Sequence, residues 1–182
     1  MRDSVGLAPA LSSALGAVLL LAAVAKSRGR RGVQEFVIDL GVAKPFAKSL
    51  VPTVIVGELV LGLLLLTGAT TVVAAIAAAV TGVFVAVQIR TIRHGTRPCS
   101  CFGALTKERT RYAGLLRASA VLGGALLLVA TAGSSASPWP QAPPLADLVA
   151  GFVLALTVLL SSALIDQTAW FLSVRIRKVV VR

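Results

Sequence analysis

The chain has 182 residues, of which 57% are hydrophobic and only 14% are charged, and its formal net charge is +11. Soluble domains carry about 25% charged residues, so this composition, with several nearly uncharged runs long enough to cross a bilayer, excludes a soluble globular domain and indicates an integral membrane protein. The basic residues lie between the apolar runs, which argues against nucleic-acid binding and fits contact with membrane lipid.

The first apolar run covers residues 7–25 and is predicted to be a retained membrane span. Its end, Ala23-Val24-Ala25, resembles the small-residue cleavage site of a signal peptide. However, only Arg2 precedes the run, offset by Asp3, and the positive charge follows the run instead. This charge distribution favours a span over a cleaved leader.

A short amphipathic helix is predicted after the first span, from Val33 to Pro45. Apolar residues recur at helical spacing on one face, and polar residues lie opposite: Val33, Phe36, Val37 and Leu40 against Gln34, Glu35 and Asp39. This pattern is typical of a helix that lies in the plane of the membrane interface. We interpret it as a lipid-anchoring connector.

Four further spans are predicted, over residues 51–67, 70–89, 113–132 and 145–165. Pro52 would lie in the first turn of its span, where proline is tolerated. Small residues spaced by four in the next span allow close helix packing. The predicted fold is all-α: a polytopic transmembrane helical bundle of about five spans, formed by one integral membrane domain over residues 1–182.

The distribution of lysine and arginine predicts the orientation in the cell membrane. Basic residues concentrate in the first connection, in the loop over residues 90–112 and in the C-terminal tail, whereas the other segments outside the spans carry only Arg2. Because cytoplasmic segments are enriched in Lys and Arg, we expect the N-terminus outside and the C-terminus and the 90–112 loop in the cytoplasm.

Cys99 and Cys101 are the only cysteines of the chain, and both lie in the 90–112 loop. A disulfide at this spacing would be strained, and strained or exposed disulfides readily undergo exchange. Nearby cations, among them Arg97, favour the reactive thiolate. The alternatives are inert or lipidated thiols and a metal site. Near the two cysteines, His94 is the only other candidate metal ligand. A closed zinc site needs four ligands, so no metal site is predicted.

Glu58 lies inside the second predicted span. Intramembrane carboxylates are rare, face the bundle interior and usually have a partner. Lys26 at the end of the first span and Arg117 in the fourth lie toward the same membrane side, so either could pair with Glu58 beneath the cysteine loop. Such an ion pair could fix helix packing, or it could form a proton relay or the polar end of a quinone pocket. The sequence leaves both interpretations open.

These features together resemble the methylamine-utilisation MauE family, within the DoxX-like group of redox-associated membrane proteins. The resemblance runs from about Leu11 to Leu128 and is carried by Lys26, Gly57-Glu58-Leu59, Leu61-Gly62, Cys99-Ser100-Cys101-Phe102-Gly103 and Arg117. Ser100 departs from the Cys-Gly-Cys loop more common in the family. The resemblance implies a four-helix core plus one span. It also implies a role in supplying or removing reducing equivalents for thiol-disulfide chemistry outside the cytoplasm, often beside a thioredoxin-like protein.

In the family this role is linked to maturation of methylamine dehydrogenase. The resemblance makes Cys99 and Cys101 the redox pair, and Lys26, Glu58 and Arg117 an associated polar set. We therefore expect a component of a thiol-disulfide oxidoreductase that exchanges electrons with a thioredoxin-like protein or a quinone, the quinone being the one candidate cofactor. The alternative is a non-catalytic scaffold or accessory subunit of a larger membrane complex.

Overall fold

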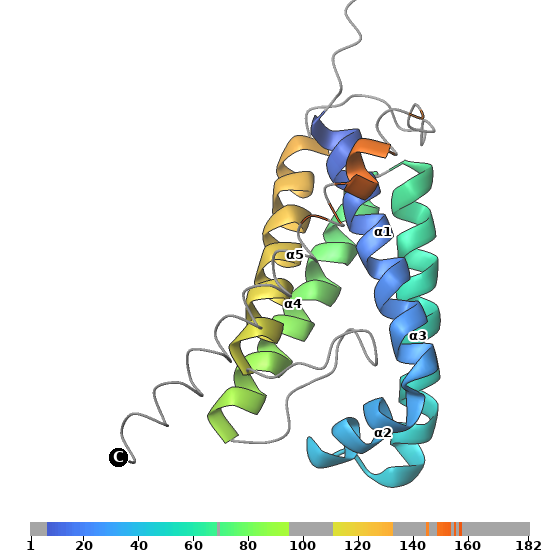
Figure 1. Cartoon of the computed structure of the whole chain (residues 1–182), viewed down its shortest axis with the longest axis vertical. Helices are drawn as coiled ribbons and strands as arrows, with labels where there is room; N and C mark the ends of the chain where they lie inside the picture. Colours follow the sequence, from blue (N-terminus) through green and yellow to red (C-terminus); the bar gives the residue numbers. More distant parts are fainter. Residues whose placement is uncertain are drawn as a thin grey trace, which may run out of the picture.

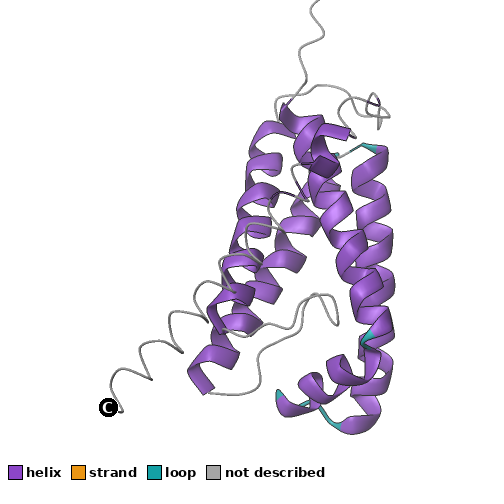
Figure 2. Cartoon of the chain, viewed as in Figure 1, coloured by secondary structure: helices purple, strands orange, loops and turns teal. Residues whose placement is uncertain are grey.

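A computed structural model describes residues 7–68, 70–94 and 111–132, together with Leu145, residues 149–153, Ala155 and Thr157. Across these residues the regular secondary structure is entirely helical (Figure 2). Four helices are long and apolar enough to cross a membrane: α1 (Leu7–Arg28), α3 (Lys44–Thr67), α4 (Thr71–His94) and α5 (Arg111–Ala132). The prediction of a polytopic all-α membrane protein is confirmed.

The four long helices run alternately up and down and form two tight pairs (Figure 1). Helix α1 packs along α3, and α4 packs along α5; α1 also contacts α5, whereas the contact between α3 and α4 is smaller. The shared core consists of Leu and Ala side chains from all four helices, with Leu65 and Leu128 fully buried. The bundle is therefore closed between α1 and α5 and looser between α3 and α4.

Helices α1 and α3 approach closely where two glycines face each other. A Cβ atom placed on Gly16 would lie 2.8 Å from the carbonyl oxygen of Gly62, and one placed on Gly62 would lie 3.0 Å from that of Gly16. Near this crossing the Ser12 hydroxyl donates a hydrogen bond to the Leu65 carbonyl, at 2.6 Å. Small residues thus let the two backbones pack together, as is typical of helices in lipid.

The helices extend beyond the predicted spans at the end of the bundle where the short helix α2 (Arg30–Asp39) lies. Helix α1 continues to Arg28, α4 continues to His94, and α3 already begins at Lys44. Pro45 therefore lies in the first turn of α3, and Pro52 lies inside the helix. The predicted place of Pro52 in a first turn is wrong, because membrane helices tolerate an internal proline.

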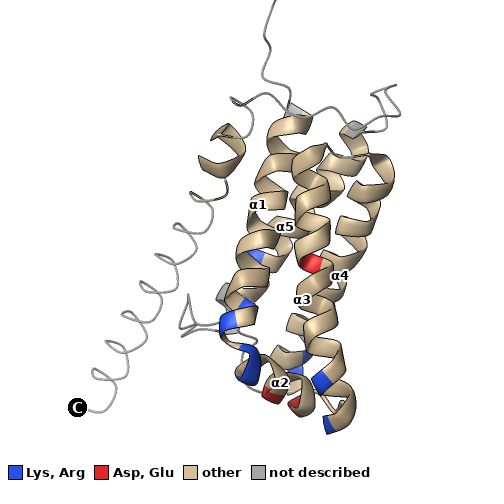
Figure 3. Cartoon of the chain, turned by 90° about the vertical axis from the view of Figure 1, so that its right-hand side faces the viewer, with Lys and Arg blue, Asp and Glu red and all other residues tan. Residues whose placement is uncertain are grey.

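The short helix α2 (Arg30–Asp39) lies at one end of the bundle and buries none of its residues. It ends at Asp39, before the predicted end at Pro45, because Gly41 adopts φ +95° and turns the chain out of the helix. In this turn the amide of Gly41 donates to the Ile38 carbonyl and that of Val42 to the Val37 carbonyl, which is the glycine stop of a Schellman motif. Most lysine and arginine residues of the described chain gather at this end, which we call the basic end (Figure 3).

The fifth predicted span, residues 145–165, is described only in part. Its described residues are helical and pack on α1: a Cβ atom on Gly151 would lie 2.6 Å from the Cβ of Ser13, and Ala155 belongs to a cluster with Ala14 and Val18. Its other residues lie outside the described chain. The described part of this segment therefore lies against α1.

Candidate functional site

Lys26 and Glu58 form a buried ion pair between α1 and α3. The Lys26 ammonium group donates a hydrogen bond to Oε1 of Glu58, and the two side chains are 6% and 1% exposed. Gly16 and Gly62 lie at the same level of the bundle, where α1 and α3 touch. From this contact, Lys26 lies about 15 Å away along α1, but Glu58 lies only about 6 Å away along α3. The lysine side chain therefore runs inward along the bundle instead of reaching out toward the lipid headgroups.

The directions of the two helices explain this inward course. Side chains in an α-helix tilt toward its N-terminus. Because α1 approaches the basic end and α3 leaves it, Lys26 tilts into the bundle while Glu58 tilts toward the basic end (Figure 1). The antiparallel pair thus brings the ammonium and the carboxylate together. Of the two predicted partners of Glu58, the structure places Lys26 at its Oε1 atom.

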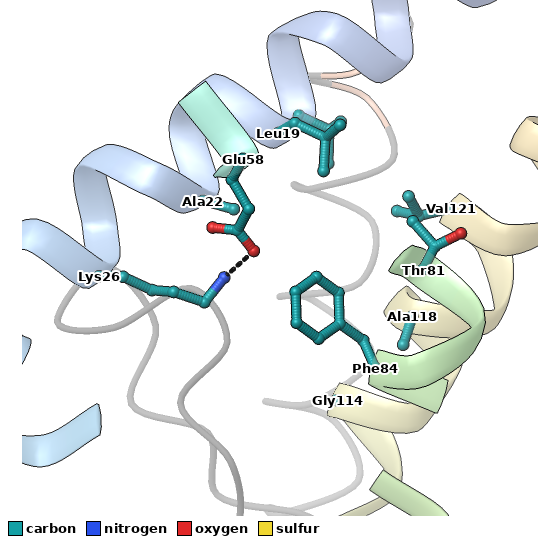
Figure 4. Close-up of a pocket in the computed structure, with 10 residues that line it drawn as sticks. Leu19, Ala22, Lys26, Glu58, Thr81, Phe84, Gly114, Ala118 and Val121 are labelled. Carbon is teal, nitrogen blue, oxygen red and sulfur yellow. Dashed lines mark hydrogen bonds and ion pairs between the residues drawn. The ribbon is translucent and has the colours of Figure 1, made fainter. Parts of the chain in front are cut away.

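Phe84 of α4 completes the surroundings of the lysine. The Lys26 nitrogen lies 5.0 Å from the centroid of the Phe84 ring (Figure 4), within the range of a cation–π interaction. Lys26, Glu58 and Phe84 border a cavity of about 40 Å³, whose other walls are Val18, Leu19, Ala22, Thr81, Gly114, Ala118 and Val121. This volume holds a few water molecules at most, so the cavity is too small for a substrate.

A buried polar stripe runs along α4, and one of its residues, Thr81, borders the same cavity as the ion pair. Thr81, Gln88 and Thr91 are all at least 98% buried and recur, with Phe84, at helical spacing. The hydroxyl of Thr81 donates to the carbonyls of Ala77 and Ala78, within its own helix. Neither Thr81 nor Phe84 was predicted as a site residue from the sequence. The available signal was that Phe84 is the only aromatic residue between positions 70 and 89.

Arg117, the third member of the predicted polar set, lies on α5. It is 3% exposed, one helical turn from Gly114 and Val121, which line the cavity. The structure thus places all three predicted polar residues in the interior of the bundle, from three different helices. Their part in a reaction stays a prediction.

Glu58 has one satisfied and one unsatisfied oxygen. Oε1 accepts the hydrogen bond from Lys26, whereas Oε2 is buried and has no hydrogen-bond partner within the described chain. A carboxylate oxygen accepts hydrogen bonds and cannot donate them when ionised. The pair can therefore offer an acceptor at Oε2 and ammonium protons at Lys26 to a third group.

Cys99 and Cys101 lie outside the described residues. Helix α4 ends at His94 and α5 begins at Arg111, and both of these helix ends lie at the basic end beside α2 (Figure 1). Among the described residues, no three or more His, Cys, Asp or Glu side chains are grouped so that they could hold a metal ion.

Comparison with protein families gives one result that covers most of the chain. The family model described as methylamine utilisation protein MauE matches residues 4–132. This range includes Lys26, Glu58, Arg117 and both cysteines. Comparison with curated proteins and with solved structures found no match.

Proposed function

The chain belongs to the MauE family of methylamine-utilisation proteins, as the resemblance noted in its sequence implied, and on that premise we propose that it is a membrane thiol-disulfide redox protein. Cys99 and Cys101 are the reacting groups, and they pass reducing equivalents to or from a partner. The partner is a thioredoxin-like protein on one side of the reaction and a lipid-soluble carrier on the other.

The observation that carries the proposal is the position of the cysteine segment in the chain. The only two cysteines are separated by one residue, and their segment is held at both ends by helices that pack along each other, α4 and α5. We expect both sulfurs at that end of the bundle, because the two helix ends that flank the segment lie there. The basic residues at that end favour the thiolate form, which is the nucleophile in exchange.

The chemistry balances as an ordinary exchange. One cysteine thiolate attacks a sulfur of the partner's disulfide, so that a mixed disulfide forms and the partner's other sulfur leaves as a thiolate. The second cysteine then attacks the mixed disulfide, closes the Cys99–Cys101 bond and releases the partner as a dithiol. Two electrons have moved to the partner. The reverse sequence delivers two electrons to the cysteine pair.

One cysteine pair by itself cannot carry electrons through a membrane. The chain contains no other thiol, so a second carrier must take the electrons from Cys99 and Cys101 or return them. The buried polar site around Glu58 supports a lipid-soluble carrier, because it offers hydrogen-bonding groups in the interior of a membrane bundle. The alternative of a non-catalytic membrane subunit requires neither the thiols nor this site.

Trapping of the mixed disulfide tests the proposal. The Cys99→Ser and Cys101→Ser variants each keep one cysteine that can attack the disulfide of a partner. Each lacks the second cysteine, which would break the mixed disulfide and release the partner. We expect one of the two variants to accumulate a reductant-sensitive complex in membranes, with a thioredoxin-fold peptide linked to the remaining cysteine, identified by mass spectrometry. The Cys99→Ser/Cys101→Ser double variant is the control and should form none. If all three variants behave alike, the redox proposal is wrong and the scaffold alternative is favoured.

A further inference from the structure

An apolar groove runs between α3 and α4. Its volume is about 500 Å³, which is within the range of sites for small ligands. Its walls, all within the described helices, expose no polar atom, and Glu58 borders it without exposing a carboxylate oxygen. Side chains on both walls, among them Val60, Leu64, Ile76 and Val83, are about half exposed on the outer surface of the helices. Because these helices lie in lipid, the groove is open to the hydrocarbon of the membrane.

The groove is about as long as the lipid chains of one membrane leaflet. It extends from Val54 to Leu64 on α3 and from Phe84 back to Val73 on α4, which is about 15–17 Å along the two helices. The hydrocarbon core of a bilayer is about 30 Å thick, so the chains of one leaflet span about 15 Å. Apolar walls of this length suit an acyl chain, which makes no hydrogen bonds.

On α4, the face that forms the groove continues to basic side chains at the basic end. Ile76 and Val83 line the groove, and Arg90 follows at the same spacing of seven residues. His94 follows Val80, another wall residue, at twice this spacing. Residues seven apart lie on one face of a helix, so Arg90 and His94, which are both exposed, lie on the face of α4 that forms the groove. Arg90 is about 10 Å beyond Val83 toward the basic end.

On α3, the corresponding face stays apolar and exposed as far as its first turn. Leu50 precedes the groove residue Gly57 by seven positions and is 43% exposed, and Phe46 precedes Leu50 by one turn and is 70% exposed. Lys48, by contrast, precedes Gly57 by nine positions, or two and a half turns, and therefore lies on the opposite face of α3. The surface that leads from the groove to the basic end is thus apolar along α3 and basic along α4.

The occupant of the groove must match apolar walls that lead to a cation. Arg90 pairs with no carboxylate among the described residues, so its charge can bind an anion. Most lysine and arginine residues of the described chain gather at the same end (Figure 3), and such clusters attract anionic headgroups. A neutral hydrocarbon would leave Arg90 without a counter-charge, and a soluble anion would leave the groove empty. An anionic phospholipid meets both requirements, because its phosphate lies in the headgroup layer directly above its chains.

We propose that the groove between α3 and α4 binds one acyl chain of an anionic phospholipid from the leaflet at the basic end, with the phosphate of its headgroup beside Arg90 and His94. The chain packs against both helices where their contact with each other is small, and so joins the two helix pairs of the bundle. Binding at this site requires neither cysteine and is separate from the proposed redox function.

Photolabelling of the full chain in phosphatidylcholine nanodiscs tests the proposal. The probe is a phosphatidylglycerol with a diazirine in the middle of one acyl chain, and the matched probe is a phosphatidylcholine with the same chain. After illumination, mass spectrometry identifies the labelled peptides. At equal, low mole fractions, we expect phosphatidylglycerol to label residues 54–64 and 73–84 about fivefold more than phosphatidylcholine does, because one arginine beside an anionic headgroup contributes about this factor. Unlabelled phosphatidylglycerol should compete.

Two charge variants test the contact with the headgroup. Arg90→Gln removes the cation beside the groove, and we expect it to abolish the fivefold preference for phosphatidylglycerol. Lys48→Gln is the matched control, because it removes one positive charge at the same end of the bundle but on the opposite face of α3. It should leave the preference unchanged. Both side chains are exposed, so both variants are expected to fold.

A pair of glycine variants tests the place of the acyl chain independently of charge. A Cβ atom at Gly57, which lines the groove, would meet no atom within 4 Å, and the same is true of Gly123 on α5, which does not line the groove. Both are therefore expected to accept leucine without disturbing the bundle. Gly57→Leu fills part of the groove and should lower its labelling about fivefold or more, whereas Gly123→Leu should leave the labelling unchanged.

Four results would overturn the proposal. Equal labelling by the two probes would show ordinary contact with bilayer lipid. A preference that Arg90→Gln and Lys48→Gln reduce equally would show general attraction to the basic end. Unchanged labelling in Gly57→Leu would place the chain outside the groove. Absence of label on α3 and α4, together with two copies of the chain retained in native mass spectrometry, would show that a second copy covers the groove.

Discussion

Lys26 and Glu58, on antiparallel helices, meet inside the bundle because each side chain tilts toward the other. A lysine near the end of a membrane helix ordinarily extends toward the headgroups. Here its ammonium group is held inside by a carboxylate and by the Phe84 ring. The pair is therefore a charged contact between α1 and α3 in the interior of the bundle.

Removal of one charge should destabilise the bundle more than removal of both. Loss of one partner of a buried ion pair costs about 3–5 kcal/mol, because the other charge stays uncompensated. We expect Lys26→Met to show this loss, and Glu58→Gln to show less of it, because an unpaired Lys26 can extend to the interface. The Lys26→Met/Glu58→Gln double variant should recover part of the loss. Unfolding free energies of the four proteins in detergent measure this, and additive losses would contradict it.

The interaction of Phe84 with Lys26 should appear as a coupling between the two residues. A desolvated cation–π contact contributes about 2 kcal/mol. Phe84→Leu should therefore destabilise the wild type more than it destabilises the Lys26→Met variant, in a double-mutant cycle of unfolding free energies. Phe46→Leu is the matched control, since Phe46 is 70% exposed. A zero coupling energy would show that Phe84 acts only by packing.

The close approach of α1 and α3 should depend on Gly62. A Cβ atom there would lie 2.9 Å from Cγ of Leu20 and 3.0 Å from the Gly16 carbonyl. We expect Gly62→Val to cost about 1–3 kcal/mol through overpacking and to disturb the Lys26–Glu58 pair. Gly57→Ala on the same helix, which meets nothing within 4 Å, should lose no stability. Thermal unfolding in detergent compares the two, and equal losses would contradict the packing argument.

The sequence predicts the helices well because hydropathy directly reflects the bilayer. It is less informative about their ends. Pro52 suggested a helix start, but an internal proline is tolerated in a membrane and α3 begins at Lys44. Helix α2 was expected to reach Pro45 and stops at Asp39, because the turn at Gly41 depends on a backbone conformation that hydropathy does not record.

The candidate site could be predicted only in part for a similar reason. A carboxylate within a span requires a cation, which narrowed the partner of Glu58 to Lys26 or Arg117. The choice between them depends on which helices are neighbours, and local sequence patterns do not contain that information. The position of Phe84 beside Lys26 depends on the same tertiary arrangement.

The orientation of the protein can be tested with its own cysteines. The basic residues predict that the segment with Cys99 and Cys101 is cytoplasmic. A membrane-impermeant maleimide should therefore modify the cysteines in inverted vesicles, after mild reduction, and leave them unmodified in intact cells. The Cys99→Ser/Cys101→Ser variant controls for background. Modification in intact cells would place this end of the bundle outside.

The decisive measurement is the redox state of Cys99 and Cys101 in native membranes. It is read from the mass added on thiol alkylation across a series of buffered potentials. The account predicts a single two-electron transition between a dithiol and a disulfide, and a shift toward the disulfide when quinone is added. Two thiols that stay reduced at every physiological potential, with or without quinone, would contradict it.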